Sequence, residues 1–541
     1  MAQTIRVLSY AVNGTGVGHL NRLIGINRWL RRYAAHAGAR IEPIFLTSSE
    51  ADGLLLTEKI ASFKMPSKTV VAESGISQGT YLALAKQWVW HSIALFRPDI
   101  FIVDTWPHGS FGELASALDL CKRRVFIYRP VNDRIGGDPS FQHMLHYYDA
   151  LIVPENRGDV EVVCAPELQD KLTYVGPIMT REPAELFSRT EARDRLGIYG
   201  DRTAIYVSAG GGGDPTSEEH LLNVCTALID DPSRHIVVGA GPLYRGRVLS
   251  GDRITWLAHG GTSDLMNGID LAVCAAGYNT FHELMHAGVP TVFIPQAKLA
   301  DEQAKRAERA VATGAAIIID DTLSGGAVEA AIAKLSPRSV RQSASQAARE
   351  LVPVNAARRA AAEILRLVLP HDAVEAAEAA VDDKLLQAAY ECRTSVYLFF
   401  DTLRAFKMHH ELARHDVEEA PELIAEIVSL IRATTDRGIP AKVVQKIAGV
   451  LRYKMQKTTV LERIRALSAI IMPLASFGDW VGATSLVKTI DIPAAELANE
   501  QMEELATTLA TLRRQGRSVY DAIAVISEQQ EQAAEARRLN G

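Results

Sequence analysis

The stretch "IRVLSYAVNGTGVGHLNR", residues 5–22, joins an apolar run to a glycine-rich turn and then to the start of a helical pattern. Its aliphatic and β-branched residues at 5–12 are typical of a buried strand. The glycines at 14, 16 and 18 allow a tight turn and a close backbone approach. A strand, a glycine turn and a helix in this order predict the first unit of a parallel α/β sheet, with His19 and Arg22 in the first turns of the helix.

Beyond this stretch, strand-like runs alternate with helical patterns along two thirds of the chain. The first series is "IRVLSYAV", "RIEPIFLT", "PDIFIVD", "RRVFIYR" and "DALIVP". The second is "TAIYVSAGGGG", "RHIVVGAG", "RITWLA", "IDLAVCAAG", "PTVFIPQ" and "GAAIIID", and "TYVGPIMTREP" connects the two. This organisation predicts two Rossmann-like α/β domains, at residues 1–175 and 176–370.

Residues 371–541 contain few strand-like runs and show repeated helical spacing, as in "PELIAEIVSLIRA". We expect a third, all-α domain here, with a role that the pattern does not define. It is a candidate surface for homo-oligomer formation.

Composition excludes several classes of protein. The 541 residues exceed what one core of about 250–300 residues can organise. A net charge of -6 gives no general attraction to nucleic acid, and the five cysteines form no CxxC pair. No run approaches the roughly 20 apolar residues of a membrane span, and no signal peptide is evident. These features predict a cytoplasmic protein.

The glycine loop differs from a dinucleotide-binding loop. Its glycines run G-x-G-x-G, and the next strand ends in "IFLTSSE" without the acidic residue that reads a ribose in that motif. His19 at a helix start is therefore a candidate base or orienting group for a bound substrate. The alternative is that the glycines only permit the turn and that His19 caps the helix.

The segment "CAAGYNTFHELMHAGVPTVFIPQAKLADEQAKRAERA", residues 274–310, predicts a ligand site at a second strand end. Gly277 allows a close turn, and a helix from about Asn279 would direct its positive end toward a diphosphate. Glu283 lies on the same helical face as Thr280 and could accept hydrogen bonds from two vicinal ribose hydroxyls. The alternative is a solvated surface glutamate. The glycine run "SAGGGG", residues 208–213, could add an anion-binding nest.

Together, "GTGVGHLNR", "SAGGGG" and the 274–310 segment resemble the family 28 group of GT-B glycosyltransferases, which includes peptidoglycan N-acetylglucosaminyltransferases and plant galactolipid synthases. The resemblance spans roughly residues 1–365 at the level of motifs. It implies two Rossmann-like domains that face a cleft, with a nucleotide-sugar donor on the second domain and an acceptor on the first.

On the matching positions, the resemblance implies that Glu283 binds the ribose and that amides near Gly277 hold the diphosphate. Asp301 and Gln303 would hold sugar hydroxyls. Arg306 departs from the asparagine of many relatives and leaves the finer sugar contacts open. The full set of predicted donor contacts is Gly16, Gly18, Gly210, Gly211, His259, Gly277, Asn279, Thr280, Glu283, Asp301 and Gln303.

The family implies inverting transfer to an acceptor hydroxyl with the help of a general base. We expect His19 to be that base, with Asp104 and His108 as the next candidates. The sequence has no D-x-D pair, which predicts catalysis without a metal or other cofactor and with a nucleotide sugar, by family habit a UDP-sugar, as co-substrate. The acceptor is unknown, and peripheral membrane contact stays open. The alternatives are a nucleotide-sugar hydrolase, a sugar-nucleotide 2-epimerase and a non-catalytic nucleotide-sugar-binding protein.

Overall fold

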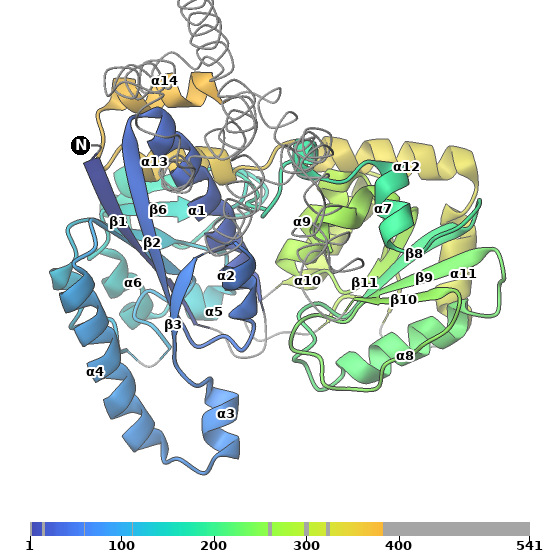
Figure 1. Cartoon of the computed structure of the whole chain (residues 1–541), viewed down its shortest axis with the longest axis horizontal. Helices are drawn as coiled ribbons and strands as arrows, with labels where there is room; N and C mark the ends of the chain where they lie inside the picture. Colours follow the sequence, from blue (N-terminus) through green and yellow to red (C-terminus); the bar gives the residue numbers. More distant parts are fainter. Residues whose placement is uncertain are drawn as a thin grey trace, which may run out of the picture. The chain divides into compact units, whose positions relative to one another are not determined.

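Two parallel β-sheets form the framework of the chain (Figure 1). The computed structural model describes residues 3–12, 17–58, 60–110, 112–257, 262–296, 302–320 and 325–381. The helical domain expected at 371–541 lies outside these residues beyond position 381, so it stays a prediction. Within the described residues, no helix is both long and apolar enough to span a bilayer.

The first sheet has the strand order β3-β2-β1-β4-β5-β6-β7. Its strands are β1 (Gln3–Ala11), β2 (Ala39–Thr47), β3 (Ala61–Lys64), β4 (Ile100–Asp104), β5 (Arg124–Ile127), β6 (Ala150–Val153) and β7 (Leu172–Tyr174). Its helices are α1 (Gly18–His36), α2 (Gly53–Thr57), α3 (Lys68–Glu73), α4 (Gln78–Phe96), α5 (Asp133–Gly136) and α6 (Pro139–Leu145), with the 3-10 turns η1 (Leu118–Leu120) and η2 (Pro166–Lys171).

The second sheet has the order β10-β9-β8-β11-β12-β13. Its strands are β8 (Thr203–Ser208), β9 (Arg234–Gly239), β10 (Ile254–Leu257), β11 (Leu271–Cys274), β12 (Thr291–Phe293) and β13 (Ala316–Ile318). The 3-10 turn η3 (Pro183–Glu185) and helix α7 (Arg189–Arg195) precede it, and within and after it come α8 (Ser217–Leu228), η4 (Ser263–Gly268), α9 (Tyr278–Ala287), α10 (Gln303–Ala312), α11 (Gly325–Leu335), α12 (Arg338–Leu351), α13 (Ala357–Leu365) and α14 (His371–Ala380).

Alternation along β8 shows why helices cover both faces of the second sheet. Ala204 and Tyr206 pack in one cluster with residues of α9, α10 and α12, whereas Ile205 and Val207 pack in another with residues of α8 and α11. Successive strand residues point to opposite faces, so an apolar run is stable only when both faces are covered. This explains the continuous apolar character of "AIYV".

In each sheet the strand order reverses at one point, and the predicted ligand-binding residues lie near that point. β1 pairs with both β2 and β4, and β8 pairs with both β9 and β11, so the segments that follow these strands diverge to opposite sides. Ligands of open α/β sheets bind at such points, beyond the carboxyl ends of the strands. His19 follows β1 and Asp104 ends β4, while Gly210 follows β8 and Gly277 follows β11.

All eleven predicted strands are present, and the two-sheet fold class is confirmed. β3 and β7 were not predicted. Both are edge strands of three or four residues, "ASFK" and "LTY", whose polar residues obscure the apolar run of a buried strand. The structure also starts α9 at Tyr278, one residue before the predicted start.

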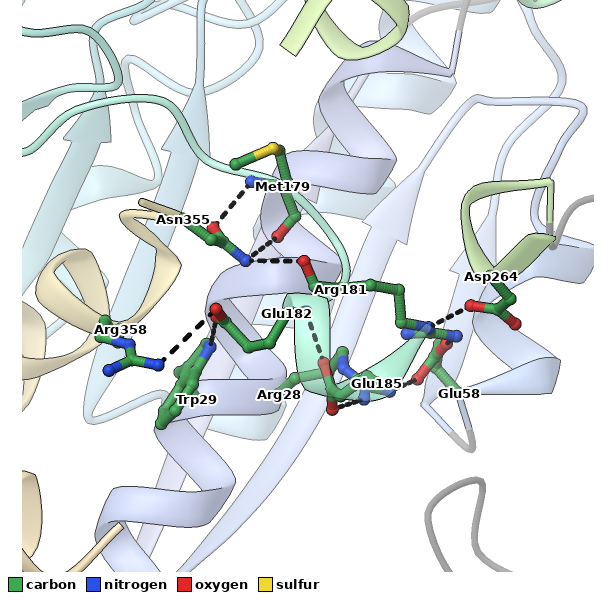
Figure 2. A network of polar contacts seen from close by, with 10 residues as sticks. All are labelled: Arg28, Trp29, Glu58, Met179, Arg181, Glu182, Glu185, Asp264, Asn355 and Arg358. Atoms are coloured by element: carbon green, nitrogen blue, oxygen red, sulfur yellow. Dashed lines mark hydrogen bonds and ion pairs between the residues drawn. The ribbon is translucent and has the colours of Figure 1, made fainter. Parts of the chain in front are cut away.

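A buried polar network holds the connection between the two sheets (Figure 2). The Asn355 side chain accepts a hydrogen bond from the Met179 amide at 3.0 Å and donates to the Met179 and Arg181 carbonyls at 3.2 Å. Arg181 bonds Glu58, at the end of α2, and Asp264, in η4. The predicted connection between the two domains is therefore fixed at successive residues.

Helix α1 joins the same network. Arg28 donates to Glu58 and Glu185, each at 2.6 Å, and the Trp29 indole donates to Glu182 at 2.8 Å. Burial alone would raise the pKa of Glu58, but Arg181 and Arg28 outweigh it and hold the pKa well below its ordinary value. The carboxylate is therefore charged at neutral pH, and removing either arginine would leave a buried anion poorly compensated.

Helix α1 packs closely against the backbone of the connection between the two sheets, at Met179. A Cβ at Gly25 would lie 2.4 Å from the Met179 carbonyl oxygen, whereas one at Gly79 in α4 would meet nothing within 4 Å. Alanine favours a helix by about 0.8–1 kcal/mol over glycine. We therefore expect Gly79→Ala to be neutral or stabilising and Gly25→Ala to destabilise by about 1–3 kcal/mol in urea unfolding. Equal stability of the two variants would contradict this packing.

Candidate active site

His19 and Asp104 form a direct contact at the switch point of the first sheet. The His19 Nδ1 lies 2.7 Å from Asp104 Oδ1, and both side chains are buried. An ionised carboxylate can only accept, so Nδ1 carries the proton and donates it to Asp104. The other ring nitrogen, Nε2, is then the basic atom of the imidazole.

Three further donors surround the Asp104 carboxylate. Arg22 binds it through two nitrogens, with Nε 2.9 Å from Oδ2 and Nη2 2.7 Å from Oδ1, and the Thr105 hydroxyl lies 2.5 Å from Oδ1. Burial alone would raise the pKa of Asp104, but Arg22 and His19 lower it far below the ordinary value. Asp104 is thus an anion that orients His19, and this arrangement disfavours it as an alternative proton acceptor.

The protonation of His19 suits a base. Burial lowers the pKa of His19 below its ordinary value of 6.5, and the attraction of Asp104 opposes this shift only in part. The imidazole is consequently neutral at pH 7, with Nε2 able to accept a proton. His108, another predicted candidate, lies beyond β4, where no described contact joins it to either residue and burial also lowers its pKa.

Thr105 shows local backbone strain beside the pair. Its φ of 66° lies in the left-handed region, which β-branched residues rarely adopt, and its side chain is fully buried. Its amide donates to the Ile127 carbonyl of β5 at 3.0 Å, which holds the turn in place. Strained residues of this kind concentrate at functional sites.

The second half of the candidate site is the N-terminus of α9. The helix begins after Gly277, which has no side chain to cap the first amides. Two buried polar atoms near this end, Asn279 Nδ2 and Glu283 Oε1, have no hydrogen-bond partner within the described residues. Thr280 lies one turn before Glu283, as predicted. An open donor and an open acceptor at the start of one helix offer hydrogen-bonding groups to a ligand.

Glu283 is unusual in its protonation. Burial raises the pKa of its carboxyl to about 7, although a hydrogen bond with Ser263 opposes the shift. The burial of Glu283 does not fit the predicted alternative of a solvated surface glutamate. The side chain is instead partly buried, with one oxygen shielded from solvent.

The glycine run at 208–213 is a tight turn packed against a second loop. Gly210 has φ of 92°, and its amide already donates to the Ser208 hydroxyl at 3.1 Å. The Gly211 carbonyl accepts from the Leu243 amide at 3.1 Å. At least one of the amides predicted to bind an anion is therefore used internally.

Gln303 and Arg306 have largely structural contacts. Gln303 Oε1 accepts from the Gln296 amide at 3.0 Å, so one of its two acceptor positions is used within the chain. Arg306 is buried and donates to the carbonyl of Ala276, in the loop between β11 and α9, at 2.8 Å. Gly18 is the first residue of α1, while Gly16, His259 and Asp301 lie outside the described residues.

An aromatic contact joins the two halves. The Arg22 guanidinium lies 4.7 Å from the ring centroid of Tyr278, the first residue of α9, and Tyr278 donates to the Pro154 carbonyl at 2.6 Å. Arg22 therefore contacts both the His19–Asp104 pair and the helix that carries Glu283. Arg22, Thr105 and Tyr278 were not predicted as site residues. Arg22 alone had a usable signal, since it lies three residues after His19 on the same helical face.

The raised pKa of Glu283 predicts a pH-dependent stability. The folded carboxyl retains its proton between its ordinary pKa of 4.5 and about 7, so its contribution is present below pH 4.5 and is lost as pH rises to 7. This shift corresponds to roughly 3 kcal/mol at most. We expect Glu283→Gln to gain stability over the wild type at pH 8 but not at pH 4.5, measured by urea unfolding.

Glu308→Gln, at an exposed glutamate of α10, is the matched control and should follow the wild type at both pH values. Identical pH dependence of Glu283→Gln and wild type would show that this carboxyl is not the shifted group.

Comparison with known proteins finds similarity to the same group. Residues 261–364 match the glycosyltransferase family 28 C-terminal domain. The chain is 28% identical over 205 residues to a UDP-N-acetylglucosamine–N-acetylmuramyl-(pentapeptide) pyrophosphoryl-undecaprenol N-acetylglucosamine transferase of Cutibacterium acnes, covering 37% of this chain and 55% of that one. It is 24% identical over 212 residues to an uncharacterised glycosyltransferase of Methanopyrus kandleri, covering 39% and 57%.

The chain thus spans little more than half the length of these curated relatives. Among solved structures, MurG of Acinetobacter baumannii aligns with 15% identity and a TM-score of 0.42, over 67% of this chain and 99% of that one. In its motifs, its two-sheet fold and the matched domain at residues 261–364, the chain resembles the family 28 glycosyltransferases of the GT-B fold.

Proposed function

We propose that the protein transfers a sugar from a nucleotide-diphosphate sugar, most simply a UDP-sugar, to an acceptor hydroxyl, with inversion and without a metal. The observation that carries the proposal is the pair of unpartnered polar atoms at the start of α9, Asn279 Nδ2 and Glu283 Oε1. A donor and an acceptor beside an uncapped helix end match the chemistry of a nucleoside diphosphate.

The donor half follows from these atoms. Vicinal ribose hydroxyls would donate to the Glu283 carboxylate, and the diphosphate would lie at the first amides of α9, where the helix dipole favours negative charge. The same amides would stabilise the charge that develops on the leaving diphosphate. This arrangement supports a mechanism in which the chain itself supplies the electrostatic stabilisation.

The acceptor half follows from His19. Its neutral imidazole would take the proton of the acceptor hydroxyl through Nε2, while Asp104 stabilises the imidazolium that forms. Arg22 keeps Asp104 ionised throughout. One base acting on the acceptor is what a single inverting displacement requires. The same base could activate water, which is why hydrolysis is the chief competing reaction.

The function is tested by incubating the protein with a panel of nucleotide sugars, with and without a native extract, and analysing the products by mass spectrometry. We expect an extract component to gain the mass of one sugar residue, and activity to survive EDTA. Rapid release of free sugar without extract would identify a hydrolase. Tight nucleotide binding without turnover would identify a binding protein. Loss of activity in EDTA and recovery with a divalent metal would contradict the proposed leaving-group stabilisation.

The role of His19 gives a kinetic prediction. We expect His19→Ala to reduce kcat by about 10²–10⁴-fold, the usual contribution of a positioned base, with little change in UDP affinity by calorimetry. At saturating donor, the wild-type kcat should fall only below about pH 6.5, because the pKa of His19 is lowered from that value. His143→Ala, at an exposed histidine of α6, is the control. Unimpaired kcat in folded His19→Ala would exclude this base.

The role of Glu283 gives a binding prediction. Ribose hydroxyls donate to the ionised carboxylate, so UDP affinity should weaken as pH falls below about 7, the pKa of Glu283. Below that pKa the weakening approaches tenfold per pH unit. Glu283→Gln should bind UDP more weakly at pH 8 and should lack this component of the pH dependence. Calorimetry between pH 6 and 8 measures both, and the variant also corrects for titration of the UDP phosphate.

A further inference from the structure

A groove of about 670 Å³ lies on the second sheet at the edge opposite the donor loops. Two of its lining residues, Asp270 and Pro290, immediately precede β11 and β12. Gly210 and Gly277, by contrast, follow the carboxyl ends of β8 and β11. Because the strands are parallel, the groove and the candidate nucleotide site are at opposite ends of the strands.

Arginine dominates this groove and a smaller hollow of about 220 Å³ that shares part of its wall. Asp270 is the carboxylate common to both, and it already binds Arg189 at 2.7 Å and Arg193 at 3.2 Å. The only other acidic side chain lining either hollow is Asp201. The arginines that line the two hollows are Arg189, Arg193, Arg202, Arg338, Arg341 and Arg349.

Arg338 and Arg341 stand out because no described side chain pairs with them. Both lie in the first turns of α12, whose first turn contains no acidic residue and whose N-cap, Pro337, offers no side-chain hydrogen bond. Positive side chains at the positive end of a helix are electrostatically unfavourable. Stability of α12 therefore does not explain these arginines, whereas a bound anion would compensate both them and the helix end.

The rest of the wall suits an anionic group attached to an organic body. Gln342 and Ser345 lie on the same face of α12 as Arg338 and Arg341 and add polar groups. Met266, Ile269 and Pro290 add apolar surface. Guanidinium groups bind phosphate oxygens in a bidentate manner, which makes arginine the preferred side chain for such ligands.

We propose that this groove is a second ligand site that binds the phosphate or diphosphate group of an organic phosphate. Arg338 and Arg341 hold the anion together with the N-terminal amides of α12, and Arg189 and Arg349 border it. The site lies apart from the proposed nucleotide site and does not depend on it. A free phosphate ester and a phospholipid headgroup present the same chemistry, so the test distinguishes them.

The test titrates inorganic pyrophosphate into the full chain by calorimetry, with UDP in excess to occupy the nucleotide site. Arg338→Gln/Arg341→Gln is compared with Lys334→Gln/Arg359→Gln, which removes the same charge from exposed positions outside the groove. We expect the first variant to lose about tenfold or more in affinity, about 1.4 kcal/mol, and the control to lose little. The Tm of Arg338→Gln/Arg341→Gln should equal or exceed that of the wild type. Equal pyrophosphate affinity in both double variants would overturn the proposal.

Two further measurements locate the site and its source of phosphate. Hydrogen exchange should show pyrophosphate protecting the first turn of α12, and protection elsewhere alone would also overturn the proposal. Sedimentation with phosphatidylglycerol vesicles, against phosphatidylcholine vesicles, identifies the source. Capture that Arg338→Gln/Arg341→Gln abolishes indicates a lipid headgroup, and pyrophosphate binding without capture indicates a free organic phosphate. UDP titrated alone reports the nucleotide site separately, so failure of one proposal leaves the other measurable.

Discussion

The candidate site depends on the hydrogen bonds and ion pairs that surround the buried carboxylate of Asp104. A charge without solvent is costly unless it is paired, and Asp104 is paired with Arg22, His19 and the Thr105 hydroxyl. This requirement brings the start of α1 to the end of β4. Since Arg22 also lies over Tyr278, the same residue contacts the first turn of α9. One arginine thus connects the candidate base to the candidate donor helix.

The network in Figure 2 extends this connection along α1. Arg28 and Trp29, two turns beyond Arg22, contact Glu58, Glu182 and Glu185, and the packing at Gly25 brings the backbone of α1 against Met179. The chain between the sheets is consequently held by α1 at one side and by Asn355 at the other. A helix fixed along its length can position a base at its start, as precise geometry in catalysis requires.

The sequence predicted the fold well because most of the strands are apolar runs that end near glycine or proline, such as β6 before Pro154 and β11 before Gly277. It predicted His19 and Asp104 as separate candidates, but not that Asp104 orients His19, because residues 85 positions apart in the sequence carry no signal of their contact. It predicted Glu283 from helical spacing, while the shielding that raises its pKa is a tertiary effect. The sequence did not predict a role for Arg338 and Arg341 at the start of α12. Exposed charges on helices are common, and only the fold shows that these two arginines line a groove.

Asp104 fixes His19 with a basic Nε2, and nitrogen-15 NMR of the histidine side chains in the full chain can detect this tautomer. Comparison with His19→Ala assigns the resonances. We expect a neutral imidazole at pH 7.5 with the proton on Nδ1, a pKa of His19 below 6.5, and loss of this tautomer preference in Asp104→Asn. Protonation of His19 on Nε2 at pH 7.5, or titration of His19 above pH 7, would exclude His19 as a base oriented by Asp104.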